Sequence, residues 1–182
     1  MTDRIRWGIL GNATIARKCV IGAIQKSRNG RVHALATRSP ADAAEIVAKT
    51  GIRNLYDGYD AVLADPAVDA VYVPLPNHLH LPWTLKALSA GKHVLCEKPL
   101  ACSAAEADEM SRAAAAAGLP LMDAVMYRFH PRSRRIRQMV RDGAIGTLRL
   151  VRTAFCFRIE DDLIRSGDNF RLNFEEPGQM CD

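Results

Sequence analysis

A lysine held between an acid and a proline is the feature of this chain that points most directly to chemistry. An apolar strand pattern around residues 93–97 ends in Glu97, Lys98 and Pro99. Strand ends in open α/β sheets point into the crevice where ligands bind, and proline, which has no N–H, stops the strand there. Lys98 is therefore a candidate acid/base. A surface lysine at a strand-to-loop turn is the commoner explanation of such a pattern taken alone.

The N-terminus has the pattern of a dinucleotide-binding turn. An apolar strand at residues 5–10 runs into Gly11 and then into a helical pattern. Gly11 takes the position where a tight turn needs a residue without Cβ, while Ala13 and Ala16 replace the second and third glycines of the fingerprint. The methyl of Ala13 limits the approach to a pyrophosphate, so a plain strand–turn–helix unit stays open as an alternative. The residues expected to contact the cofactor here are Gly11, Asn12, Ala13 and Ile15.

A second strand pattern, at residues 32–37, ends where a ribose-binding acid is expected, roughly 20 residues after the fingerprint. Thr37, Arg38 and Ser39 stand there instead. A guanidinium and a hydroxyl can hold a 2′-phosphate that a carboxylate would repel. The sequence therefore favours NADP, with NAD possible; the alternative is that Arg38 is a solvated loop arginine.

The composition indicates a globular protein. The chain has 182 residues, of which 48% are hydrophobic and 25% charged, enough for one domain and part of another. The start lacks an apolar leader and no run is long enough to span a bilayer, so we expect a cytoplasmic protein without a membrane partner. Its 5 cysteines include no Cys-x-x-Cys pair, so we expect neither a disulfide framework nor a metal site.

The formal net charge of +5 comes largely from the arginines between Arg128 and Arg141. Ile136 and Met139 recur among them at helical spacing, and the chain has no nucleic-acid-binding motif. We therefore expect an amphipathic helix with a solvated basic face, and no nucleic-acid partner.

Strand and helix patterns alternate along most of the chain, which is the order of βαβ units. Strands are expected at residues 5–10, 32–37, 68–73, 93–97 and 120–126, and helices at 14–25, 40–49, 59–64, 79–90 and 104–117. This alternation predicts a doubly wound parallel sheet of the Rossmann type over residues 1–125, in the α/β class.

The pattern changes after this domain. Residues 147–157 alternate polar and apolar side chains, as a half-solvated antiparallel strand does. We therefore expect residues 126–182 to be a connecting helix followed by the truncated start of an α+β open-sheet domain.

Four stretches occur together in a fixed order: Gly8–Ala16, Pro74–His80, Cys96–Pro99 and Met126–Pro131. With these motifs in this order and at this spacing, the chain resembles the N-terminal half of members of the Gfo/Idh/MocA oxidoreductase family. The alanine-bearing fingerprint with Arg38 is similar to that of its NADP-using branch, which contains D-xylose dehydrogenases, glucose–fructose oxidoreductase and dihydrodiol dehydrogenases.

The resemblance implies hydride transfer between NADP(H) and a CH–OH carbon of a sugar or polyol, with Lys98 moving the hydroxyl proton. It implies that Glu97 orients or balances Lys98, and that Tyr127 and Arg128 border the nicotinamide. The further residues implied to line the cofactor are Pro74, Leu75, Pro76, Asn77 and His80. Each has a structural alternative: Asn77 can cap the following helix, His80 can pack or cap in its first turn, and Tyr127 can belong to the core.

Family members continue through a large open sheet that covers the substrate site and supports homo-oligomers. Asp182 matches the aspartate of a second family motif, implied to be catalytic, and the sequence stops before the histidine of that motif. Two hypotheses follow. The chain belongs to an NADP-dependent sugar or polyol oxidoreductase, or it is a catalytically inactive, truncated NADP-binding or dimerising module.

Overall fold

The computed structural model describes residues 4–154, 156 and 158. Within them the chain forms two units, one that ends at Ala124 and one that begins at Val125.

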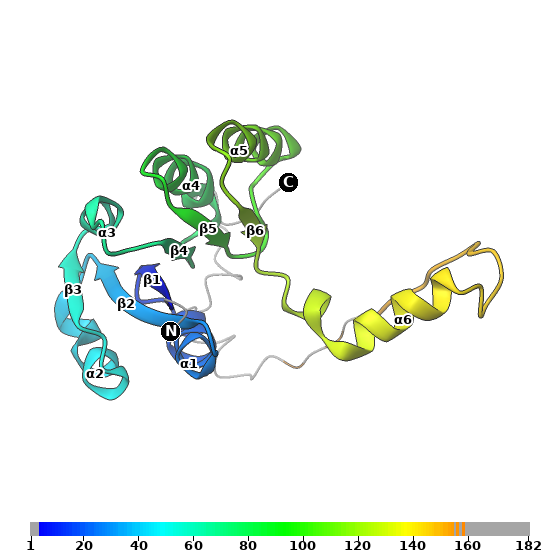
Figure 1. Cartoon of the computed structure of the whole chain (residues 1–182), viewed down its shortest axis with the longest axis horizontal. Helices are drawn as coiled ribbons and strands as arrows, with labels where there is room; N and C mark the ends of the chain where they lie inside the picture. Colours follow the sequence, from blue (N-terminus) through cyan, green and yellow to red (C-terminus); the bar gives the residue numbers. More distant parts are fainter. Residues whose placement is uncertain (1–3, 155, 157, 159–182) are drawn as a thin grey trace. The chain divides into compact units, whose positions relative to one another are not determined.

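The first unit is built on a six-stranded sheet (Figure 1). Its strands are β1 (Ile5–Leu10), β2 (Gly30–Thr37), β3 (Asn54–Asp57), β4 (Ala70–Val73), β5 (His93–Cys96) and β6 (Leu121–Asp123). They are ordered β3-β2-β1-β4-β5-β6, and each neighbouring pair is parallel. The chain reverses its direction of travel across the sheet between β1 and β4, which is the topological switch point of a Rossmann fold. The predicted doubly wound sheet is confirmed.

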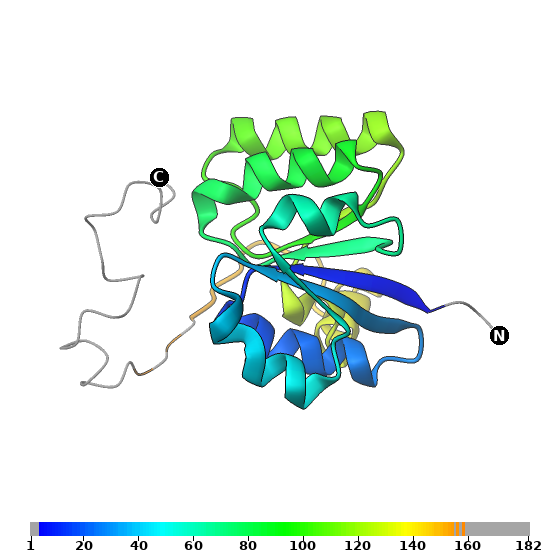
Figure 2. The same ribbon diagram turned by 90° about the vertical axis from the view of Figure 1, so that its left-hand side faces the viewer.

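Helices cover both faces of this sheet (Figure 2). They are α1 (Ile21–Lys26), which follows a π-helical turn at Ala16–Val20, α2 (Pro40–Thr50), α3 (Tyr59–Ala64), α4 (His80–Ser89), which follows a 3-10 turn at Asn77–Leu79, and α5 (Ala104–Ala117). One apolar cluster joins Ile9, Leu35 and Tyr72 of the strands to α1 and α2, and the other packs Val71 and Val94 against α3, α4 and α5. Because both faces are buried, the central strands are almost continuously apolar.

Strand β3 has little signal in the sequence. Its residues Asn54–Asp57 begin and end with polar side chains, and only β2 pairs with it. A short edge strand of this kind depends on its neighbour more than on its own residues. The sequence patterns therefore do not predict β3, which forms the edge of the sheet.

The prediction of a strand at residues 147–157 is wrong for the residues of this range that the structure describes. Residues 148–154 have no regular secondary structure. A strand exists only through hydrogen bonds to a neighbour, and no other described segment pairs with these residues. Phe155 and Phe157 lie outside the described residues.

The second unit contains a 3-10 turn at Met126–Phe129 and the helix α6 (Pro131–Arg141). The helix bears out the amphipathic pattern, but its apolar residues Ile136 and Met139 are exposed, as are Leu148 and Leu150 after it. Among the described residues of both units, no helix has the length and apolar character needed to cross a membrane.

Candidate functional site at the carboxyl edge of the sheet

Four sequence-predicted stretches follow the ends of four adjacent strands. Gly11 follows β1, Arg38 follows β2, Pro74 follows β4 and Glu97 follows β5. Parallel strands end at the same edge of a sheet, so the topology brings these stretches together on both sides of the switch point. That edge is where open α/β sheets bind ligands.

Gly11 makes the tight turn that the fingerprint requires. Its φ is +106°, which L side chains rarely adopt, and a Cβ built there would lie 3.0 Å from Leu75 Cδ2. Its N–H donates to the Ala36 carbonyl at 2.7 Å, which ties the turn to the end of β2. Only glycine fits this turn without strain, which is the role of the first glycine in a dinucleotide fingerprint.

The turn after β2 carries a cation and no acid. Thr37 is buried, and its Oγ1 accepts a hydrogen bond from the Ser39 N–H at 3.2 Å. This bond fixes the direction of the chain just where Arg38 and Ser39 become exposed. A guanidinium and a hydroxyl on a fixed turn fit the 2′-phosphate of NADP.

His80 joins the turns that follow β4 and β5. The side chain is fully buried, with Nε2 2.8 Å from the Leu75 carbonyl oxygen and Nδ1 2.8 Å from that of Pro99. Both ring nitrogens therefore face the protein's own backbone. This geometry favours the packing alternative over direct contact with a cofactor, and it places His80 behind the site. Pro74 and Leu75 are also buried, whereas Pro76 is exposed and Asn77, which begins the 3-10 turn, is half-buried.

Glu97 is anchored on three sides. Its N–H donates to the Val73 carbonyl at 3.1 Å, its Oε1 accepts from the Tyr72 hydroxyl at 2.7 Å, and its Oε2 accepts from the Lys98 N–H at 3.1 Å. Lys98 is exposed immediately beyond. The carboxylate thus fixes the backbone from which Lys98 departs. Tyr72 was not identifiable from the sequence pattern, in which it is one of several apolar residues of β4.

Two groups close to this turn, the Cys96 thiol and the Tyr72 hydroxyl, have raised pKa values. Burial raises the pKa of the Cys96 thiol to about 12, so Cys96 stays protonated and is not a nucleophile near neutral pH. Burial, together with the Glu97 carboxylate, also raises the pKa of Tyr72, which keeps its hydroxyl a hydrogen-bond donor. Lys98 is left as the exposed group of this turn that can move a proton.

Three residues that the sequence predicts for the active site do not belong to the described part of the first unit. Tyr127 and Arg128 belong to the 3-10 turn of the second unit, where both are exposed. Their approach to a nicotinamide stays a prediction. Asp182 lies outside the described residues.

A doubly wound sheet with a glycine turn after β1 and a basic turn after β2 has the features of a dinucleotide-binding domain, and Lys98 follows β5 at the same edge. The family model described as an oxidoreductase family with an NAD-binding Rossmann fold, GFO_IDH_MocA, matches residues 5–124. The chain belongs to this family.

Relatives of known name agree with this assignment. D-xylose 1-dehydrogenase (NADP(+)) 2 of Haloferax volcanii is 44% identical over 167 residues, which are 92% of this chain and 50% of the relative. The dTDP-3,4-didehydro-2,6-dideoxy-alpha-D-glucose 3-reductase of Streptomyces violaceoruber is 39% identical over 161 residues, 87% of this chain and 47% of the relative.

A solved structure has the same fold. It is that of KijD10, a 3-ketoreductase from Actinomadura kijaniata in complex with TDP-benzene and NADP, with a TM-score of 0.73 and 39% identity over 79% of this chain and 45% of that one. The chain thus spans about half the length of the proteins it matches.

Proposed function

We propose that the chain is the cofactor-binding half of an NADP-dependent oxidoreductase that transfers a hydride between NADP(H) and a CH–OH group of a sugar or polyol-like substrate. The observation that carries the proposal is the exposed Lys98 after β5, whose backbone N–H is held by Glu97, at the same edge of the sheet as the glycine turn after β1. The xylose dehydrogenase and the dTDP-sugar reductase among the relatives support the substrate class.

The preference for NADP over NAD rests on Arg38 and Ser39. They stand at the end of β2, where an acid would hydrogen-bond the ribose of NAD and repel a 2′-phosphate. The names of the xylose dehydrogenase and of the solved ketoreductase complex both include NADP, which supports this preference.

Lys98 has a defined part in the oxidation of an alcohol. When bound, NADP supplies the nicotinamide C4 that takes the hydride. The Lys98 amine accepts the hydroxyl proton while the C–H bond breaks and the carbon–oxygen double bond forms, so the substrate loses one hydride and one proton. In the reverse direction the Lys98 ammonium returns the proton to the oxygen.

We also propose that residues 126–182 begin the domain that completes the substrate site and forms homo-oligomers. The exposed apolar residues of the second unit, such as Met139 and Leu150, support a surface of this kind. The lack of a membrane-spanning helix in the described residues is compatible with a cytoplasmic location, which is part of the proposal.

Two measurements test the proposed function. Titration of this chain with NADPH and with NADH, followed by the fluorescence of these reduced cofactors, is expected to give tighter binding of NADPH than of NADH. A form of the protein that includes the second half is then assayed with a panel of aldoses and polyols for nicotinamide reduction. NADP binding without turnover of any member of the panel would leave the cofactor-binding module as the function, and tighter NAD binding would refute the interpretation of Arg38.

A further inference from the structure

Tyr72 places a phenol hydroxyl in the interior, directly behind the turn that carries Lys98. The residue lies on β4 and is fully buried in the cluster that contains Ile9 and Ala16. Its register partner on β5 is Leu95, two residues before Glu97. A buried tyrosine hydroxyl needs a hydrogen-bond partner, and this one donates to Glu97 Oε1 at 2.7 Å.

Both oxygens of the Glu97 carboxylate are engaged by this part of the fold. Oε1 accepts from Tyr72 and Oε2 accepts from the backbone N–H of Lys98. In the part of the chain that the structure describes, no salt bridge involves the Lys98 ammonium. The carboxylate next to Lys98 in the sequence therefore binds its backbone and not its side chain.

This arrangement matters because an adjacent carboxylate is the natural partner of an ammonium group. A pair between the two would favour the charged form of the lysine and reduce the fraction of free amine near neutral pH. The buried hydroxyl opposes that pair, since Glu97 must give up its hydrogen bond to Tyr72 before it can turn toward the ammonium. The other titratable groups that influence Tyr72 are the thiols of Cys19 and Cys96, both without charge when protonated.

We propose that Tyr72 is a positioning residue for proton transfer: by holding Glu97 against the backbone, it sets the direction in which Lys98 leaves β5 and keeps its amine unpaired. The proposal deepens the function proposed above and rests on the role of Lys98 in it. It gives β4, which contributes no exposed side chain of its own to the site, a part in the chemistry.

The test measures the reactivity of one amine. The intact chain is treated with a trace of acetic anhydride, which reacts only with the unprotonated amine, and the acetylation rate of Lys98 is read from its peptide mass between pH 6 and 10. Tyr72→Phe removes the hydroxyl alone. We expect Lys98 to react about two- to fivefold more slowly near neutral pH, the range that an exposed ion pair produces. Adding Glu97→Gln to Tyr72→Phe is expected to restore the rate.

The chain offers matched controls. Tyr56, on the edge strand β3, also donates its hydroxyl to a carboxylate, that of Asp65, at 3.1 Å. Tyr56→Phe is expected to leave the rate at Lys98 unchanged. Lys86, on α4 and paired with Asp60, is the internal reference for acetylation in every sample.

Several results would overturn the proposal. One is an unchanged rate at Lys98 in Tyr72→Phe with its thermal unfolding transition intact; another is a slower rate that Glu97→Gln does not restore. Should Tyr72→Phe fail to fold, Glu97→Gln alone decides. We expect it to change the rate less than about twofold, whereas a fivefold gain would mean that the carboxylate already pairs with the ammonium.

The labelling requires neither cofactor nor turnover, so its outcome is separate from that of the proposed function. In a form with both halves, Tyr72→Phe is further expected to move the pH midpoint of alcohol oxidation upward by about 0.3 to 0.7 unit, the same two- to fivefold effect. Its NADP affinity is expected to stay within about twofold. Absence of turnover in the unsubstituted protein would refute the proposed function and leave the labelling result standing.

Discussion

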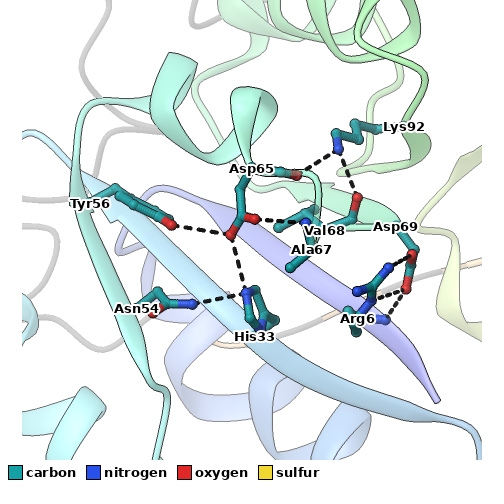
Figure 3. A network of polar contacts seen from close by, with 9 residues as sticks. All are labelled: Arg6, His33, Asn54, Tyr56, Asp65, Ala67, Val68, Asp69 and Lys92. Atoms are coloured by element: carbon teal, nitrogen blue, oxygen red, sulfur yellow. Dashed lines mark hydrogen bonds and ion pairs between the residues drawn. The ribbon is translucent and has the colours of Figure 1, made fainter. Parts of the chain in front are cut away.

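The two edges of the sheet use polar residues in opposite ways. At the carboxyl edge, Arg38, Ser39 and Lys98 are exposed at the ends of their strands. At the amino edge, polar residues that begin or precede strands bond to one another (Figure 3). Arg6 of β1 binds Asp69, which precedes β4, through Nε and Nη2 at 2.9 and 2.6 Å. The polar groups of the amino edge bond to one another, and those of the carboxyl edge are exposed.

Asp65 is the centre of the amino-edge network. It accepts hydrogen bonds from the Ala67 N–H at 2.7 Å and the Tyr56 hydroxyl at 3.1 Å, and it lies 3.1 Å from His33 Nε2. Burial alone would raise the pKa of Asp65, but these partners outweigh it, so the pKa lies below its ordinary value. The network links the loop between α3 and β4 to strands β2 and β3 (Figure 3).

Two lysines on either side of β5 show the difference most directly. Lys92, just before the strand, is 7% exposed, and its Nζ donates to the carbonyls of Asp65 and Val68 at 2.8 Å each. Lys98, just after the strand, is exposed. The same residue type is hydrogen-bonded to backbone carbonyls at one end of the strand and exposed at the other. The position of a lysine relative to the strand direction, more than its type, therefore indicates its role in this fold.

The strongest test of this comparison removes the amine from the carboxyl edge. Lys98→Ala is expected to lower turnover of a form with both halves by about 10²–10⁴-fold, the usual contribution of a general acid/base. The free energy of unfolding should change by less than about 0.5 kcal/mol, because the side chain is exposed. NADP titration and chemical unfolding accompany the kinetics. Turnover within tenfold of the parent would remove Lys98 from the mechanism.

Removal of the lysine at the amino edge should lower stability and leave cofactor binding unchanged. Lys92→Met leaves the buried Val68 carbonyl without this donor, whereas the Asp65 carbonyl keeps its hydrogen bond from the Val68 N–H. We expect a loss of about 1–3 kcal/mol in the free energy of unfolding, with NADP affinity unchanged. Urea unfolding measures the loss. Lys86→Met is the matched control; that side chain is exposed, pairs with Asp60 and lies 4.3 Å from the Trp83 ring centroid. It should cost less than about 1 kcal/mol. Equal losses in both variants would contradict the contrast.

Local patterns predicted one edge of the sheet and not the other. Gly11, Arg38 and Glu97 each follow a strand directly in the sequence, so a strand prediction is enough to place them at the carboxyl edge. The amino-edge contacts join distant residues, such as Arg6 and Asp69, which are 63 positions apart. Such partners become neighbours only once the strand order is known.

Tyr72 was missed for a related physical reason. Within β4 it is one apolar-looking residue among Ala70, Val71 and Val73, and its hydroxyl reaches Glu97 only because β4 and β5 pair in the observed register. The helices were more predictable, since caps and periodicity are local: α3 and α5 have the expected bounds, and Gly51 and Gly118 end α2 and α5 in the left-handed conformation.

A smaller effect is expected from the arginine that follows β2. Arg38→Ala should weaken NADP binding by about 10- to 100-fold, the value of hydrogen bonds to a charged group, while NAD affinity stays within about twofold. Isothermal titration of this chain with both cofactors measures the ratio. Arg53→Ala is the control, because Arg53 is also exposed but precedes β3 at the amino edge. A parallel loss for NAD would assign Arg38 to the fold and not to the 2′-phosphate.

The smallest effect concerns acid stability at the amino edge. The hydrogen bonds from Arg6 lower the pKa of Asp69 from 3.8 to about 2. A folded-state pKa below the unfolded value contributes stability above about pH 4 that is lost as the pH falls toward 2. Because the side chain is 35% exposed, solvent screening limits this contribution to about 1 kcal/mol or less. Asp69→Asn should therefore be slightly less stable at pH 7 and lose less stability between pH 4 and 2, as measured by urea unfolding across that range. An equal slope in both proteins would mean that Asp69 does not report on acid unfolding, and the paired network of the amino edge would then owe its stability to Asp65 and Lys92 instead.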